Sequence, residues 1–275
     1  MNSFKEKVVY VVGGSSGIGL AAAKLLTAEG AHVLILARRK ELLEQAVRAI
    51  SAGAPWSSQR IAGLSLDISD DRQVKEVVGQ GLSEFGIPDL LINSAGVSHP
   101  GYFNAIPYED FDETLKVNLY GIWSITSALV PPMKTRGGII VNVSSVPGYI
   151  GLFGAAAYCA SKFALIGFSE ALRSELKPHG IRVSVLCPPD TDTPLLHEAN
   201  RTKPEETKAI SKKAKLMQPD EVAKALIKGL RKNQFMIIPG FDSKVLFWIK
   251  RLFPWFIDAM VDRAIRKSRS EGGNS

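Results

Sequence analysis

The chain has 275 residues, 45% of them apolar and 22% charged, which is enough apolar material to bury the core of one main α/β domain. Two cysteines, Cys159 and Cys187, stand far apart in apolar segments, which argues against a disulfide framework and against a metal site. The net charge of +7 is compatible with an acidic partner, but neither a zinc-finger spacing nor an RNA-binding motif is present, so no nucleic acid partner is expected.

A polar start leads into a short apolar run, 8–12, which is too short for the core of a secretory signal, so we expect a cytoplasmic protein. Similar runs alternate with longer helical patterns, which predicts a Rossmann-like, doubly wound parallel sheet with helices on both faces. The predicted strands are 8–12, 32–37, 61–66, 90–92, 139–143 and 183–186. The predicted helices are 18–29, 40–50, 71–85, 108–133, 156–178 and 219–231.

A glycine-rich turn follows the first predicted strand directly and opens the first predicted helix. Glycines let a backbone approach a pyrophosphate, and a helix N-terminus offers free N–H groups, so this turn predicts a dinucleotide site. A tight turn without a ligand is the alternative. The residues expected to bind the cofactor here are Gly13, Ser15, Ser16, Gly17, Ile18 and Gly19.

The end of the second predicted strand carries Arg38 and Arg39, where NAD sites usually carry a carboxylate for the ribose hydroxyl. Guanidinium suits the extra 2′-phosphate, so these arginines predict NADPH rather than NADH, and surface charges at a helix start are the alternative. Further along the same sheet edge, Asp67 and Ile68 are expected beside the adenine. Asn93, Ala95 and Gly96 end the fourth strand there and complete this part of the predicted site.

Tyr158 and Lys162 are four residues apart on a predicted helix, so their side chains share one face. A carbonyl that accepts hydride needs a proton, and a nearby ammonium lowers the pKa of a phenol, so we expect an acid and its activator here. Ser145 closes a predicted strand where its hydroxyl can reach the same oxygen. Asn118 lies in an apolar helical segment, either to hold a relay water or as an ordinary buried amide.

These motifs together resemble the short-chain dehydrogenase/reductases over roughly residues 5 to 240. The resemblance implies that Tyr158 is the general acid, that Lys162 also contacts the nicotinamide ribose, and that Asn118 supports a proton relay. It also implies that Ser145 orients the substrate carbonyl. Two positions depart from the family pattern, because Val12 stands in place of a threonine and Pro189 in place of a glycine. The remaining cofactor contacts expected from it are Pro188, Thr191 and Thr193, beside Tyr158 and Lys162.

The polar segment 188–215 is the expected substrate lid. Its sequence is similar to the lid of the 3-ketodihydrosphingosine reductase subfamily, which implies NADPH-dependent reduction of a long-chain amino ketone to dihydrosphingosine. An apolar channel for the chain is expected from Leu152, Phe153, Leu195 and Leu196. Asp190 or Asp192 is expected to face the substrate ammonium. Another ketone, such as a 3-oxoacyl thioester, a steroid or a xenobiotic, and a non-catalytic NADP(H) sensor remain alternatives.

We expect residues 1–242 to form the reductase domain and 243–275 to form an amphipathic apolar and basic segment. Within it, the apolar run is shorter than the ~20 residues that a spanning helix needs. Residues 244–257 are expected either to contact a membrane surface peripherally or to pack against a second subunit of a homo-oligomer.

Overall fold

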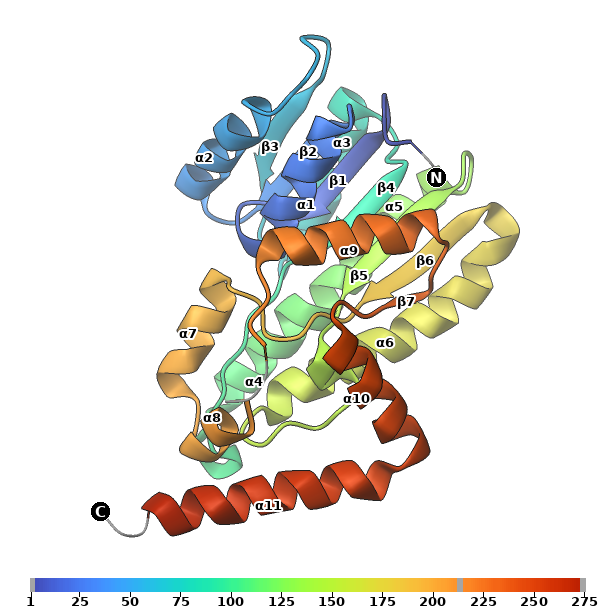
Figure 1. Ribbon diagram of the computed structural model, residues 1–275. Helices are drawn as coiled ribbons and strands as arrows, with labels where there is room; N and C mark the ends of the chain where they lie inside the picture. The colour runs from blue at the N-terminus through green and yellow to red at the C-terminus, as the bar shows by residue number, and fades with distance from the viewer. Residues whose placement is uncertain (1–2, 212–214, 273–275) are drawn as a thin grey trace.

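The computed structural model describes residues 3–211 and 215–272, and in this part of the chain seven strands form one parallel sheet. Its order is β3-β2-β1-β4-β5-β6-β7 (Figure 1). Strands β2 and β3 are added on one side of β1 and strands β4 to β7 on the other, so the strand order reverses between β1 and β4. The doubly wound fold expected from the sequence is therefore confirmed. The strands are β1 Val8–Val12, β2 His32–Ala37, β3 Ile61–Ser65, β4 Leu90–Asn93, β5 Gly138–Val143, β6 Ile181–Leu186 and β7 Met236–Ile237.

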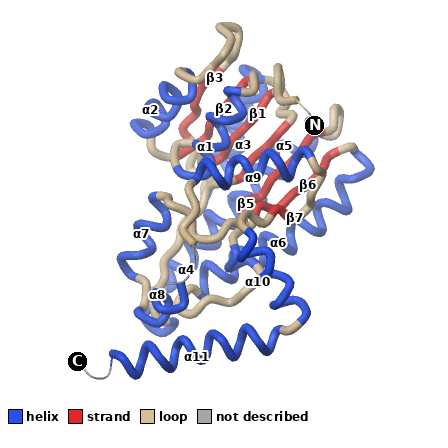
Figure 2. The backbone as a smooth tube through the Cα atoms, in the orientation of Figure 1, coloured by secondary structure: helices blue, strands red, loops and turns tan. Residues whose placement is uncertain are grey.

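Helices cover both faces of the sheet, and each face has its own apolar core (Figure 2). Residues of α1, α2 and α9 pack on one face, and residues of α3, α5 and α6 pack on the other. Along β1, Val9 and Val11 enter the first core while Tyr10 and Val12 enter the second, which explains why the strand is apolar throughout. These helices are α1 Gly17–Ala28, α2 Lys40–Ser51, α3 Asp71–Phe85, α5 Gly121–Met133, α6 Ala156–Leu176 and α9 Pro219–Arg231.

The single helix expected over 108–133 is interrupted. Helix α4 Tyr108–Leu115 passes into a π-helical turn, Lys116–Tyr120, before α5 begins. A π-turn inserts one residue into the helix and so rotates the following face, and such turns occur frequently at functional sites. Here the turn holds Asn118 with no solvent exposure.

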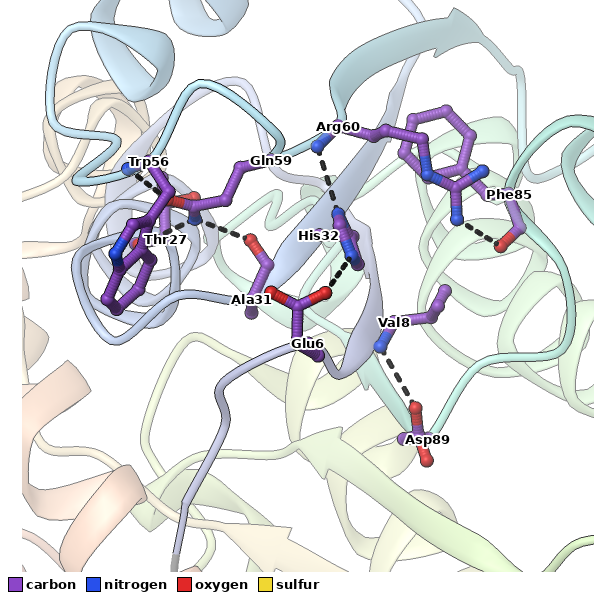
Figure 3. Close-up of polar contacts among 10 residues, drawn as sticks. All are labelled: Glu6, Val8, Thr27, Ala31, His32, Trp56, Gln59, Arg60, Phe85 and Asp89. Carbon is purple, nitrogen blue, oxygen red and sulfur yellow. Dashed lines mark hydrogen bonds and ion pairs between the residues drawn. The ribbon is translucent and has the colours of Figure 1, made fainter.

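The amino ends of the strands are closed by polar contacts that have no part in the predicted site (Figure 3). Asp89 accepts the backbone N–H of Val8 at 2.9 Å, and Arg60 donates to the carbonyl of Phe85 at 3.1 Å. The ring of His32 accepts the N–H of Arg60 at 3.0 Å. These contacts anchor one edge of the sheet, and the opposite, carboxyl edge carries the cavity described below.

The expected lid contains two helices, α7 Pro194–Thr202 and α8 Glu205–Ser211, and its residues 212–214 lie outside the described residues. The C-terminal segment forms α10 Phe241–Leu252 and α11 Pro254–Gly272, and its last residues 273–275 are likewise outside. Helix α11 lies alongside α8 (Figure 1). None of the helices described for this chain combines the length and the apolarity that crossing a bilayer requires.

Candidate active site

A cavity of about 560 Å³ opens at the carboxyl edge of the sheet, and residues of the expected lid line part of it. It runs from the glycine-rich turn, past the ends of β2, β4 and β5, to the lid helix α7. Most of the residues predicted for the site line it, although they come from distant parts of the sequence. These are Gly13, Ser15, Ser16, Gly17, Ile18, Arg38, Arg39, Asp67, Ile68, Ala95, Gly96, Ser145, Tyr158, Lys162, Pro188, Thr191 and Thr193.

The glycine-rich turn has a geometry that side chains would disrupt. Gly13 has a φ of +76°, and a Cβ atom there would lie 2.6 Å from the backbone nitrogen of Ala95. Gly17 has a φ of +53°. At Gly19 a Cβ would lie 2.4 Å from the carbonyl oxygen of Gly13, so this glycine packs the helix against the turn behind the cavity wall. The turn thus leaves backbone exposed to the cavity at the start of α1, a surface that fits a pyrophosphate.

Arg38 stands at the end of β2 with 61% of its side chain exposed, beside the cavity. Its guanidinium lies 3.9 Å from the carboxylate of Asp67. Burial raises the pKa of Asp67, but hydrogen bonds from Ser69 and the charge of Arg38 outweigh it, and the net shift is downward. An exposed guanidinium at this position fits the 2′-phosphate of a bound dinucleotide.

Tyr158 lines the cavity near its inner end, together with Ser145. Burial raises the pKa of Tyr158 to about 12, the hydroxyl of Ser145 lowers it, and the carboxylate of Asp190 raises it further. The phenol is therefore protonated at neutral pH. The lowered phenol pKa expected from the sequence is not found, because burial outweighs the favourable contacts.

Lys162 lies one helical turn after Tyr158, with its Nζ 5.5 Å from the centre of the tyrosine ring. The residue is only 3% exposed, and burial lowers its pKa to about 8. Its Nζ donates to the carbonyl of Val143 at 3.0 Å, which fixes the side chain at the end of β5. The ammonium therefore faces the ring of Tyr158 from a fixed position at the cavity wall.

Asn118 does not line the cavity but holds its wall from behind. Its Oδ1 accepts the N–H of Val97 at 2.8 Å, and its Nδ2 donates to the carbonyl of Val97 at 2.9 Å and to Ser161 at 3.0 Å. The amide thus ties the segment after β4 to α6. At Gly96, beside these hydrogen bonds, a Cβ atom would lie 3.3 Å from Oδ1 of Asn118 and 3.6 Å from Nζ of Lys162.

Asn93, predicted as a cofactor residue, also lies away from the cavity. It is fully buried, and its Nδ2 donates to Asn142 at 2.8 Å and to Thr126 at 3.3 Å. Asn142 in turn donates to Ser169 at 2.8 Å. Asn93 therefore belongs to a polar network inside the core, between the sheet and the helices α5 and α6.

The segment expected to be the lid lines the cavity with both apolar and charged side chains. Leu152, Leu195 and Leu196 line it as expected, whereas Phe153 turns away and packs edge-on against Tyr102 with ring centres 6.1 Å apart. Lys203 also lines the cavity, although no sequence pattern indicated it. A lysine in a polar loop is ordinary, and only the folding of the lid brings this one to the cavity.

A buried carboxylate joins the lid to two other segments. Glu206 on α8, with 7% of its side chain exposed, accepts the hydroxyl of Tyr102 at 2.9 Å. Its other oxygen accepts Nε of Arg269 on α11 at 3.2 Å. We name this the Glu206 latch, comprising Tyr102, Glu206 and Arg269. A hydrogen bond from its own backbone N–H, together with those from Tyr102 and Arg269, outweighs burial and lowers the pKa of Glu206.

Comparison with known proteins agrees with this geometry. The model of the family described as "short chain dehydrogenase" matches residues 7–204. The chain is 40% identical over 240 residues to the 3-ketodihydrosphingosine reductase of Mus musculus, covering 86% of this chain and 72% of that protein. It is 34% identical over 222 residues to the 3-oxoacyl-[acyl-carrier-protein] reductase FabG of Thermotoga maritima, covering 80% of this chain and 89% of that one.

Among solved structures, the apo form of LigD from Sphingobium sp. strain SYK-6 superposes with a TM-score of 0.76 at 30% identity, covering 93% of this chain and 98% of that one. Similarity thus extends over sequence and fold alike, and it includes the strands and helices that build the cavity. The chain belongs to the short-chain dehydrogenase/reductase family of oxidoreductases, as its motifs predict.

Proposed function

We propose that this chain reduces the ketone of 3-ketodihydrosphingosine to dihydrosphingosine with NADPH. The observation that carries the proposal is one cavity that joins three parts: the glycine-rich turn with Arg38, the Ser145, Tyr158 and Lys162 set, and a lid with an apolar wall. The identity with the mouse 3-ketodihydrosphingosine reductase, which exceeds that with FabG, supports this substrate.

The residues present fit the cofactor. The glycine-rich turn leaves backbone free for the pyrophosphate, Arg38 is exposed for a 2′-phosphate, and Thr193 faces the same cavity from the lid side. NADPH, when bound, supplies the hydride that the ketone carbon accepts. Everything else in the reaction falls to side chains of this chain.

Tyr158 donates its hydroxyl proton to the ketone oxygen as negative charge develops there. A pKa of about 12 keeps the phenol protonated at neutral pH, so the proton is present before the reaction. The Ser145 hydroxyl donates a hydrogen bond to the same oxygen and stabilises the negative charge that develops on it. Lys162, held on the carbonyl of Val143, stabilises the tyrosinate that remains.

The apolar side of the cavity suits a long alkyl chain. Leu152 from the segment before α6 and Leu195 and Leu196 from the lid present aliphatic surface next to Tyr158. About 0.8 kcal/mol per buried methylene makes such a wall a strong selector for chain length. A 3-oxoacyl thioester, a steroid or a xenobiotic ketone would use the same three catalytic groups, so the lid has to make the distinction.

The test is NADPH oxidation, followed at 340 nm, by the purified chain with 3-ketodihydrosphingosine in mixed micelles. We expect turnover with NADPH, much slower turnover with NADH, and none in Tyr158→Phe. A 3-oxoacyl thioester, a steroid ketone and a xenobiotic ketone serve as comparison substrates. Faster turnover of any of them would contradict the substrate, and binding of NADPH without turnover of any ketone would favour the non-catalytic alternative.

We further propose that residues 243–275 form a segment added to the reductase domain 1–242, and that α10 and α11 contact a membrane surface. Helix α10 buries Ser243 and exposes Phe241, Val245, Trp248 and Leu252, which lie on one face at helical spacing. Helix α11 follows α10 after a sharp bend (Figure 1), and exposed apolar residues continue from this bend into α11. These residues are Phe253, Trp255, Phe256 and Met260.

Charge favours a lipid surface over a second copy as the occupant. Basic residues outnumber acidic ones in 241–272, and Lys244, Arg251 and Arg263 are exposed residues of the same two helices. A two-fold interface sets each patch against its own copy, so these cations would oppose one another, whereas anionic lipid complements them. Exposed aromatic residues on α4, the π-turn and α5, among them Tyr120 and Trp123, offer a separate surface for a homo-oligomer.

Sedimentation with vesicles tests this contact. We expect the chain to bind vesicles containing phosphatidylglycerol more strongly than phosphatidylcholine alone, and the double variant Trp248→Ser, Trp255→Ser to lose most of that binding. Trp56→Ser, which changes an exposed tryptophan at the other end of the molecule, is the control. If the double variant has half the mass of wild type in light scattering and binds vesicles as wild type does, the patch is instead a subunit contact.

A further inference from the structure

Two carboxylates of the lid, Asp190 and Asp192, are close in sequence but have different surroundings. Resting on the proposed function, we propose that Asp190, and not Asp192, binds the ammonium of the amino ketone, and that Lys203 is the counterion that occupies this carboxylate until substrate binds. This assigns a residue that sets specificity, beyond the general chemistry of Ser145, Tyr158 and Lys162.

Asp190 is open toward the cavity. It lines the cavity together with Tyr158, and its side chain is 36% exposed. Within the described part of the chain its carboxylate has one charged partner, the Nζ of Lys203 at 3.9 Å, which is longer than a hydrogen bond. Its backbone is fixed, because its carbonyl accepts the N–H of Met217 at 3.0 Å. The backbone that carries this carboxylate is thus held in place, and the carboxylate oxygens are available.

Asp192 is already engaged. One of its oxygens contacts Nε2 of His197 at 2.6 Å, and the other accepts Nε2 of Gln218 at 3.4 Å. It does not line the cavity. Asp192 therefore stabilises the start of α7 within the lid. Glu198 does line the cavity, but its carboxylate lies 2.9 Å from Arg201 on the exposed side of α7.

Lys203 has an unusual position for a lysine, because only 9% of its side chain is exposed. Its ammonium reaches the cavity wall and lies opposite Asp190. An isolated buried ammonium would be costly, and the nearby carboxylate of Asp190 makes the buried position of Lys203 tolerable. A substrate ammonium that enters between them offers Asp190 a closer cation.

The position of Asp190 also explains why a cation is needed there. Its negative charge contributes to the raised pKa of Tyr158, and so opposes the formation of tyrosinate. The amine of 3-ketodihydrosphingosine is on the carbon next to the ketone, so an ammonium bound at Asp190 lies beside the oxygen that Tyr158 protonates. The substrate ammonium cancels the negative charge of Asp190, which otherwise opposes the formation of tyrosinate. A ketone without an amine leaves that charge uncompensated.

The test compares two ketones of equal length, 3-ketodihydrosphingosine and the same ketone with hydrogen in place of the amine. Wild type, Asp190→Asn and the matched control Asp192→Asn are assayed with both at saturating NADPH. We expect Asp190→Asn to raise KM for the amino ketone about 10- to 100-fold, the usual loss for a hydrogen bond to a charged group. For the ketone without the amine, KM should be unchanged and kcat unchanged or higher.

Asp192→Asn should not distinguish the two ketones. The assignment is overturned if Asp190→Asn raises KM equally for both ketones, or for neither. Calorimetric binding of dihydrosphingosine gives a second measurement that requires no turnover. A weaker Kd in Asp190→Asn than in Asp192→Asn supports the assignment, and equal Kd values refute it. A wild type that prefers the ketone without the amine contradicts the proposed substrate, whatever the variants do.

Discussion

Replacing Asn118 by alanine separates a structural role from a purely catalytic one. The substitution removes three hydrogen bonds, two to Val97 and one to Ser161, from a side chain with no solvent exposure. At about 1 kcal/mol for each bond, the free energy of unfolding should fall by roughly 3 kcal/mol. For a chain of this size that corresponds to a fall in Tm of about 5 °C.

The substitution should also weaken cofactor binding, because Asn118 holds the segment after β4 whose residues Ala95 and Gly96 line the cavity. We expect NADPH affinity, measured by fluorescence titration, to fall together with the unfolding midpoint in urea. The matched control is Asn142→Ala, which removes two hydrogen bonds of another fully buried amide away from the cavity.

The control should lose about 2 kcal/mol of stability and keep its affinity for NADPH. The reasoning is refuted if Asn118→Ala retains its stability within 1 kcal/mol and loses only kcat, a result that would leave relay of a proton as its whole contribution.

Three further predictions concern the cofactor turn and the buried lysine. Arg38→Ala should weaken NADPH about 10-fold or more and leave NADH unaffected in fluorescence titrations, because only the 2′-phosphate loses its partner; equal weakening would contradict this. Gly13→Ala should lower the free energy of unfolding by at least about 2 kcal/mol, because of its positive φ and its contact with Ala95, whereas Gly79→Ala in the open helix α3 should raise it by up to about 1 kcal/mol in the same urea titrations. Because burial lowers the pKa of Lys162 to about 8, the unfolded chain binds more protons than the folded chain between pH 8 and 10, so wild type should gain about 2 kcal/mol over Lys162→Met as pH rises through that window; a constant difference in urea unfolding would refute it.

The sequence predicted the sheet, its flanking helices and most of the cavity, because alternating apolar runs and the ends of parallel strands follow simple periodicities. It missed β7, which has only two residues and pairs with β6 through the fold rather than through its own pattern. It also missed the π-turn, since one inserted residue changes the direction of Asn118 without changing the apolar content of the helix.

Charges were harder to predict than positions. Proximity of Lys162 suggested a lowered pKa for Tyr158, but the depth of the site reverses the direction, and depth is not encoded in a four-residue spacing. The choice between Asp190 and Asp192 likewise depends on which carboxylate the folded lid engages with His197, and the approach of Lys203 depends on the path between α7 and α8.

The Glu206 latch has a consequence for the order of events during turnover. A lid held only at its two hinges opens by itself, but here α8 shares a buried carboxylate with α11 and with Tyr102. Opening α8 therefore breaks contacts with both neighbours at once, and the C-terminal helix has to yield at the same moment. Release of a long-chain product would then depend on α11. Loss of α11 would change the dissociation rate of the product more than the rate of the chemical step.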